Sequence, residues 1–203
     1  MDSTEKLIEL FKEFPGIGPR QAKRFVYFLL NKNPSYTNDL AKLITDVRAN
    51  VHSCQSCFRF FPNGKSSSCP ICRDDSRDKT ALMLVSHDVD FENIEKTGFY
   101  NGYYFILGGN IPILEKNPEK RIRQKDLLEV VEKRIKDGLK EIILALNYNP
   151  EGENTLTYLK ELMPRHALDS KIKISTLGRG LSTGTELEYS DSDTIKNALK
   201  NRQ

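Results

Sequence analysis

The stretch Phe14-Pro15-Gly16-Ile17-Gly18-Pro19-Arg20-Gln21-Ala22-Lys23-Arg24 predicts a tight turn between two helices. Pro15 stops a preceding helix, because proline lacks an amide hydrogen and restricts the residue before it. Gly16 and Gly18 allow a turn in which bare backbone amides face outward. Pro19 suits the first turn of the next helix, and the amides of that turn can bind a phosphate.

The helix after this turn is predicted to carry a basic outer face. A helical projection groups three cations and one aromatic ring on one side, Arg20, Lys23, Arg24 and Tyr27. The opposite side is apolar and can pack inward, through Ala22, Phe25, Val26 and Leu29. Two helices joined by a glycine turn form a helix-hairpin-helix, which binds the nucleic-acid backbone without reading sequence. The alternative is an ordinary helix pair with a solvated basic face, but the Pro-Gly-Ile-Gly-Pro core followed by clustered cations favours phosphate binding.

The charges of the 203 residues separate a basic first third from the rest of the chain. Residues 1–79 contain 13 Lys and Arg against nine Asp and Glu, whereas residues 80–203 contain 18 against 19. The first third is therefore suited to a polyanion and the remainder to another role. The apolar content of 38% and charged content of 29% are typical of one or two small globular domains. No apolar run has the length of a membrane span or a signal-peptide core, so we expect a cytoplasmic protein.

Two further helices are predicted beside the basic one. Residues 4–14 carry an apolar stripe, and Ser3 or Thr4 can cap that helix. Residues 31–35 predict a loop after the basic helix. A third helix is predicted from Thr37 towards the first cysteine, with apolar residues at helical spacing.

All four cysteines of the chain lie in two short pairs that predict a metal site. Cys54-x-x-Cys57 and Cys69-x-x-Cys72 are separated by 11 residues. Four thiolates in two such turns fit one tetrahedral zinc ion, which would be structural because no position stays open for water. Disulfides are the alternative, and the expected cytoplasmic location argues against them. His52 lies close to the first pair, but four cysteines already complete the ligand set.

From residue 80 onward the pattern alternates strands and helices. This α/β order predicts a mostly parallel sheet with helices on both faces, preceded by a small all-α part. The functional loops of such sheets follow the carboxyl ends of the strands. The strands are predicted at residues 81–85, 103–107, 141–146 and 172–175, and the helices at residues 90–97, 123–137, 153–163 and 192–202.

The order of motifs along the chain is distinctive. The hairpin core and the cysteine pairs are followed by Leu107-Gly108-Gly109, by Asn147-Tyr148-Asn149-Pro150-Glu151-Gly152-Glu153 after a strand, and by Arg179-Gly180-Leu181 with residues 182–189 near the end. This order resembles the bacterial RecR family of recombination proteins over essentially the whole chain. The resemblance implies four parts: a helix-hairpin-helix DNA-binding domain (1–53), a four-cysteine zinc finger (54–79), a Toprim domain (80–176) and a C-terminal segment with an oligomer-contact helix (177–203).

The resemblance also implies how the chain works. RecR-like proteins form ring-shaped homotetramers that clamp DNA, act with RecO and RecF at single-strand gaps, and help to load RecA in DNA repair. The DNA-contacting cations of the family match Arg20 and Arg24, and Lys23 is added because it shares their helical face. Glu151 and Glu153 are interpreted as a contact surface for a basic partner such as RecO, and the alternative is that they only stabilise a helix start.

Two positions depart from the pattern that the resemblance implies. Toprim enzymes hold magnesium with a Glu after the first strand and an Asp-x-Asp after a later one, whereas this chain has Ser86 and Asn147-Tyr148-Asn149. Asparagine brings no charge to magnesium, so we expect a non-enzymatic DNA-binding mediator rather than a magnesium-dependent nuclease or a zinc-dependent scaffold. The second departure is Gly184-Thr185, where the family usually has Gly-Gly. The loop from Gly178 to Gly184 lacks the ending of a P-loop and is interpreted as structural or as a subunit contact.

Overall fold

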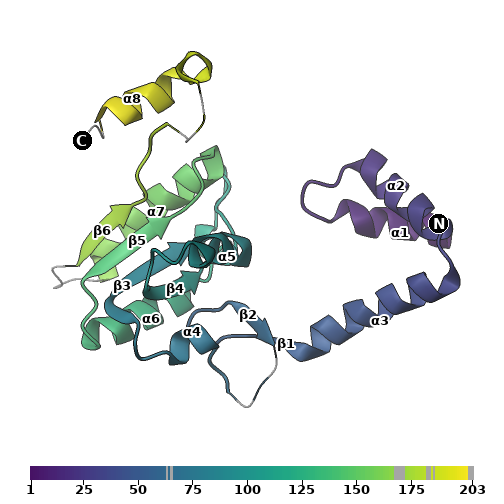
Figure 1. Ribbon diagram of the computed structural model, residues 1–203, viewed down its shortest axis with the longest axis horizontal. Coiled ribbons are helices and arrows are strands. Elements are labelled where there is room, and N and C mark those ends of the chain that lie inside the picture. The colour runs from purple at the N-terminus through teal and green to yellow at the C-terminus, as the bar shows by residue number, and fades with distance from the viewer. Residues whose placement is uncertain (63, 65, 167–171, 182–183, 185, 201–203) are drawn as a thin grey trace. The chain divides into compact units, whose positions relative to one another are not determined.

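The computed structural model describes residues 1–62, 64, 66–166, 172–181, 184 and 186–200, and of residues 164–166 only the backbone. The chain forms two compact units, Met1–Val51 and His52–Gln203 (Figure 1). Thr185 of the Gly184-Thr185 pair lies outside the described residues, as do residues 201 and 202 at the end of the last expected helix.

The first unit contains the helices α1 (Ser3–Lys12), α2 (Pro19–Leu30) and α3 (Pro34–Asn50). The prediction that Ser3 or Thr4 caps α1 is wrong, because Asp2 does so. Its carboxylate accepts the Glu5 amide at 2.8 Å, while the Glu5 carboxylate accepts the Asp2 amide at 3.1 Å. This reciprocal pair satisfies two amides that the helix itself leaves unpaired.

Helix α3 begins three residues earlier than the predicted Thr37, so part of the expected loop is helical. The side-chain oxygen of Asn33 accepts the Tyr36 amide at 2.8 Å and caps the helix. Pro34 then occupies the first helical position, where its missing amide hydrogen costs nothing.

The turn between α1 and α2 is closed as its glycines predict. Gly16 has φ +75°, a left-handed conformation that glycine adopts without strain. Ala22 and Val26 of α2 are buried against α1. Phe25 was expected to pack inward but is 39% exposed, although its ring centre lies 5.8 Å from that of Phe11.

The second unit is built on a parallel sheet of four strands, which confirms the predicted α/β class. The strand order is β4-β3-β5-β6, and each neighbouring pair runs parallel. Strand β4 therefore lies at one edge of the sheet. The strands span β3 (Asp78–Val85), β4 (Gly102–Ile106), β5 (Glu141–Ala145) and β6 (Lys173–Thr176).

Helices cover both faces of this sheet (Figure 1). Alternate strand residues face opposite sides. Leu82 and Leu84 pack with α6 and α7, whereas Met83 and Val85 pack with Phe91 of α5. The helices span α5 (Asp88–Thr97), α6 (Gln124–Lys136), α7 (Pro150–His166) and α8 (Ser192–Lys200).

Several short elements of the chain were not predicted. Each is three or four residues long, too short to show a periodic pattern. They are the two paired strands β1 (Val51–Ser53) and β2 (Phe60–Pro62), the helical turn α4 (Pro70–Arg73), and the 3-10 turns η1 (Pro118–Lys120) and η2 (Leu187–Tyr189).

Candidate metal centre and nucleic-acid interface

The four cysteines meet in one cluster of the second unit, where their Sγ atoms all lie within 4.8 Å of one another. Two backbone turns bring them there. In the first turn the Phe58 amide donates to the Cys54 carbonyl at 2.9 Å, and Phe58 takes φ +63°, which residues other than glycine rarely adopt. In the second turn Cys69 directly precedes α4. The x-x spacing of each pair thus places its two thiols in one cluster.

The chemistry of this cluster fits a metal ion. The Cys54 sulfur accepts amide hydrogens from Ser56 at 3.4 Å and from Cys69 at 3.2 Å. Hydrogen bonding with Cys54, followed by the other two thiols and burial, raises the pKa of the Cys57 thiol. Crowded thiols of this kind cannot all ionise without a cation between them. Zinc–sulfur bonds of about 2.3 Å would hold tetrahedral ligands roughly 3.8 Å apart, which this cluster accommodates.

The cysteines adopt neither of the two alternatives, a disulfide bond or a ligand set that includes His52. None of the four cysteines forms a disulfide. His52 is exposed on β1 and takes no part in the cluster. Among the described residues, no second group of three or more His, Cys, Asp or Glu side chains lies close enough to share a metal ion.

The cysteine cluster is continuous with the core of the sheet. The ring centre of Phe58 lies 5.3 Å from that of Phe105 in β4. Ile71, between the last two cysteines, packs both against the cluster and against the sheet residues around Met83. Folding of the cluster and folding of the sheet edge are therefore coupled.

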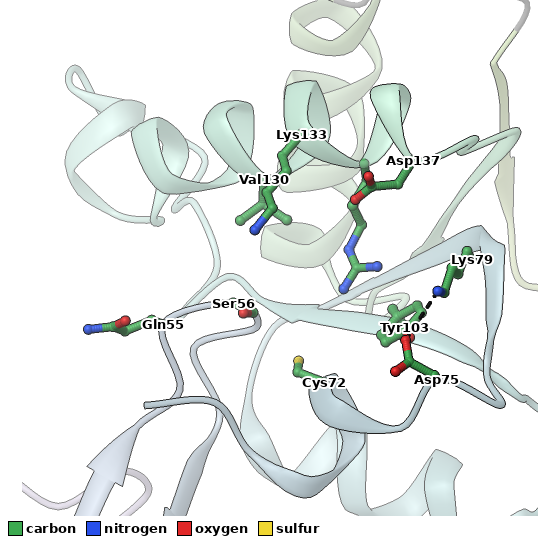
Figure 2. Close-up of a pocket in the computed structure, with 10 residues that line it drawn as sticks. Gln55, Ser56, Cys72, Asp75, Lys79, Tyr103, Val130, Lys133 and Asp137 are labelled. Atoms are coloured by element: carbon green, nitrogen blue, oxygen red, sulfur yellow. Dashed lines mark hydrogen bonds and ion pairs between the residues drawn. The ribbon is translucent and has the colours of Figure 1, made fainter. Parts of the chain in front are cut away.

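A pocket of about 430 Å³ opens beside Cys72 (Figure 2). Cys72 is partly exposed, whereas the other three cysteines are buried. Val130 and Lys133 of α6 form the opposite wall. Lys79 is held aside by an ion pair with Asp75 at 3.1 Å. One metal ligand is thus approachable from solvent.

The predicted DNA-binding residues Arg20, Lys23 and Arg24 are all exposed on α2. Within the described part of the chain, none of them forms an ion pair. The Arg24 guanidinium donates to the side-chain oxygen of Gln21 at 3.3 Å, and its charge stays uncompensated. Gly18 offers no side-chain acceptor to the first turn of α2, so the amides of that turn remain available to an anion.

Three polar residues at the carboxyl edge of the sheet are committed to hydrogen bonds within the protein itself. The Ser86 hydroxyl is fully buried and donates to the side-chain oxygen of Asn110 at 2.6 Å. Asp88 accepts the Phe60 amide at 2.7 Å. Asn149 accepts the Gly152 amide at 2.8 Å through its side-chain oxygen. This donor set does not fit the magnesium ion of Toprim enzymes, which needs several free carboxylates.

The acidic pair lies in the first turn of α7, where carboxylates also stabilise the helix dipole. Glu151 is exposed and has no ion pair among the described residues. Glu153 pairs with Arg179, with 3.0 Å between the carboxylate and the guanidinium. Gly152 separates the two acids because a β-carbon there would overlap the Asn147 carbonyl oxygen.

Comparison with known proteins identifies three regions. Residues 4–48 match the RecR helix-hairpin-helix family, residues 80–178 match the Toprim domain, and residues 180–203 match the RecR C-terminal family. The "Recombination protein RecR" of Chloroflexus aggregans is 38% identical over 199 residues, which cover 98% of this chain and 92% of the relative. Those of Bifidobacterium adolescentis and Ureaplasma urealyticum are 37% and 33% identical over 201 residues, covering 98% of this chain and 94% of each relative.

The chain belongs to the RecR family of recombination proteins.

Membership in the RecR family confirms the predicted resemblance and the order of a hairpin, a cysteine cluster and a Toprim-like sheet. The Toprim match includes Ser86 and the Asn147-Tyr148-Asn149 segment. Every helix in the described residues is too short or too polar to cross a membrane.

Sequence reasoning missed Arg179 as a residue of the acidic site. Its loop was interpreted as structural or as a subunit contact, because a loop carries no periodicity that would link it to α7. Its basic charge within a loop expected at the carboxyl edge of the sheet was the one available signal.

Proposed function

We propose that this RecR-family chain is a non-enzymatic, DNA-binding mediator of recombination and repair. The observation that carries this proposal is the outer face of α2, where Arg20, Lys23 and Arg24 are exposed beside helix amides that lack a side-chain cap. Such a surface offers cations and N–H donors to phosphates, which are the groups that position a protein on nucleic acid without reading its sequence. The function would be carried out in the bacterial cytoplasm, at the nucleoid.

The metal in this proposal is one structural zinc ion per chain. Cys54, Cys57, Cys69 and Cys72 would hold it, and all four positions of a tetrahedral ion would be filled by protein. When bound, zinc supplies cross-linking rather than chemistry. It would fold the segment between the hairpin and the sheet.

The absence of catalysis is supported by the carboxyl edge of the sheet. Ser86 and Asn149 use their side chains in internal hydrogen bonds, and Asp88 holds a backbone amide. Metal-assisted phosphoryl transfer requires acidic ligands that these residues do not supply. A binding role for the Toprim domain is therefore the simpler proposal.

The proposed working parts are the hairpin domain (1–53), the zinc finger (54–79), the Toprim domain (80–176) and the C-terminal segment (177–203). The C-terminal helix would contact a second copy and help to close a homotetrameric ring around DNA. Several hairpins acting on one DNA would convert weak phosphate contacts into long residence. RecO, RecF and loading of RecA at single-strand gaps complete the proposal, with Glu151 and Glu153 as the contact for RecO.

A salt-series titration on gapped DNA tests the proposal. The Arg20→Ala/Arg24→Ala variant should bind DNA more weakly than the unmodified protein, and the loss should be similar for DNA molecules of unrelated sequence. The slope of log K against log salt should become shallower by about 0.7–0.9 for each phosphate that the variant no longer neutralises. Lys6→Ala/Lys42→Ala removes the same charge from α1 and α3 and serves as the matched control.

Three results of that titration would contradict parts of the proposal. Equal affinity of the Arg20→Ala/Arg24→Ala variant and the unmodified protein would remove α2 from the DNA site. Equal losses in the two double variants would assign the effect to net charge alone. Magnesium-dependent cleavage of the DNA on a denaturing gel, persisting through repurification, would overturn the non-enzymatic assignment.

A further inference from the structure

Arg179 sits between an aromatic ring and a carboxylate at the carboxyl edge of the sheet. Its guanidinium lies 4.1 Å from the centre of the Tyr148 ring and 3.0 Å from the Glu153 carboxylate. Tyr148 follows β5, Glu153 lies in the first turn of α7, and Arg179 follows β6. Three separate segments thus build one binding position for a cation, which we term the Tyr148–Glu153 clamp.

The clamp is held in shape without Arg179. The Tyr148 hydroxyl donates to the carbonyl of Leu177, which fixes the ring against the end of β6. The Glu153 amide donates to the Asn149 carbonyl at 2.9 Å, so the acid is placed by the helix itself. A preorganised ring and carboxylate loses little conformational entropy when it exchanges one bound cation for another.

The clamp opens onto a cavity of about 690 Å³. Glu153, Asp191 and Asp193 line this cavity together with Arg179, Lys196 and Lys200. Asp191 is already used, since it accepts the amide and hydroxyl hydrogens of Thr194 at 2.8 Å and 2.6 Å. The acidic and basic side chains that line the cavity are equal in number only while Arg179 is among them. If the Arg179 side chain left the clamp, one other cation could take its place.

We propose that the Tyr148–Glu153 clamp receives an arginine or lysine side chain of a basic partner protein, and that Arg179 is its resident occupant in the free chain. This inference rests on the proposed function, in which Glu151 and Glu153 contact a basic partner. Glu151 has no ion pair among the described residues and would attract the partner first. The partner's cation would then displace Arg179 from the clamp.

The strength of the internal contact suits such an exchange. The side chains of Arg179 and Glu153 are 37% and 50% exposed. Exposed ion pairs and exposed cation–π contacts each change an equilibrium by about fivefold or less. These two contacts therefore lower the affinity for the partner only modestly.

Binding of the purified full chain to purified RecO, measured by calorimetry or surface plasmon resonance, tests the inference. The Arg179→Ala variant should bind about three- to tenfold more tightly, because the partner no longer competes with an internal cation. Lys196→Ala removes one positive charge from the same cavity without emptying the clamp and should change affinity by less than about twofold. Arg179→Ala in a Glu153→Gln background should give no gain.

The outcomes separate this inference from the proposed function. Weaker binding by Glu153→Gln together with unchanged or weaker binding by Arg179→Ala would overturn the inference and leave the partner surface standing. Equal gains from Arg179→Ala and Lys196→Ala would also overturn it, because net charge alone would explain them. Unchanged binding by both Glu151→Gln and Glu153→Gln would remove the partner surface and the inference together.

Discussion

The Ile106 amide of β4 donates a 2.8 Å hydrogen bond to the carbonyl of Cys57. Strand β4 is an edge of the sheet, so its outer side would otherwise present unpaired backbone groups to solvent. The first cysteine turn partly takes the place of a neighbouring strand. The cysteine cluster therefore also covers part of the edge of the sheet.

Loss of the metal should consequently weaken the sheet. Cys57→Ser/Cys69→Ser removes two ligands, and we expect Tm of the second unit to fall by about 10 °C or more. The physical reason is the loss of several kcal/mol of binding energy, at about 2–4 °C per kcal/mol for a unit of this size. Calorimetry gives Tm, and hydrogen exchange of residues 102–106 reports on the edge strand. His52→Ala, beside the cluster but outside it, is the control.

A second outcome of that exchange experiment would argue against the coupling. If the double cysteine variant lowered Tm while the β4 amides stayed as protected as before, the cysteine turn would be a passive attachment. Faster exchange at Ile106 than at the inner strand β3 is the expected pattern, because only β4 borders the cysteine turn.

The pocket beside Cys72 predicts an order of chemical modification. Cys72 should be alkylated by N-ethylmaleimide before the other three cysteines of the metal-loaded protein, because it alone is partly exposed. Peptide mapping by mass spectrometry measures the order. Val130→Phe narrows the pocket and should slow labelling of Cys72, whereas protein unfolded in urea and chelator should lose the preference. Initial labelling at Cys54 or Cys69 would contradict the prediction.

The sequence was most informative where burial or metal chemistry constrained it. Strand β5 was predicted at residues 141–146 and is observed at Glu141–Ala145, because a short run of branched apolar residues is typical of a parallel strand that is covered on both faces. The cysteine cluster was predicted from spacing alone, because two Cys-x-x-Cys pairs are typical of a site in which four thiolates bind one zinc ion. The family followed from the order of motifs along the chain.

What the sequence could not predict depends on contacts between distant segments. The cap of α1 is a different case, because the Asp2-x-x-Glu5 spacing of a capping box is a local signal that the placement at Ser3 or Thr4 overlooked. The strands β1 and β2 exist because the cysteine turn joins them. Arg179 reaches Glu153 only after β5 and β6 pair. The sequences of the loops that follow these two strands do not indicate that pairing.

Burial of Tyr100 predicts a loss of stability at alkaline pH. Desolvation, followed by the neighbouring Tyr104 and Asp78, raises the pKa of the Tyr100 hydroxyl, which donates to the Tyr103 carbonyl at 2.9 Å. Above the ordinary tyrosine pKa of about 10 the unfolded chain loses this proton while the folded chain keeps it. The free energy of unfolding should therefore fall as pH rises beyond about 10.

Urea unfolding at pH 8, 10 and 11 measures this dependence. Tyr100→Phe should cost about 1 kcal/mol at pH 8 through the missing hydrogen bond, and should flatten the decline at higher pH. Tyr189→Phe removes a hydroxyl from a side chain that is 77% exposed and should leave the curve unchanged. Parallel curves for Tyr100→Phe and the unmodified protein would show that Tyr100 does not carry the effect.

The hairpin turn offers a test in which two neighbouring glycines should behave differently. Gly16 has φ +75°, so Gly16→Ala forces a β-carbon into the left-handed region at a cost of about 1 kcal/mol. Gly18 has φ −85° as the residue before α2, and a β-carbon there meets nothing within 4 Å. Gly18→Ser should therefore keep or slightly raise stability, because serine can cap the helix.

Thermal unfolding of the two variants measures stability, and titration onto gapped DNA shows whether turn geometry matters for binding. Gly16→Ala should lower Tm and weaken DNA binding, since Arg20 and the first amides of α2 are positioned by the turn. Gly18→Ser should separate the two properties, because its hydroxyl would occupy the amides that a phosphate needs while leaving the fold intact. Equal DNA affinity in Gly18→Ser and the unmodified protein would show that the α2 amides do not contact phosphate and that the cations act alone.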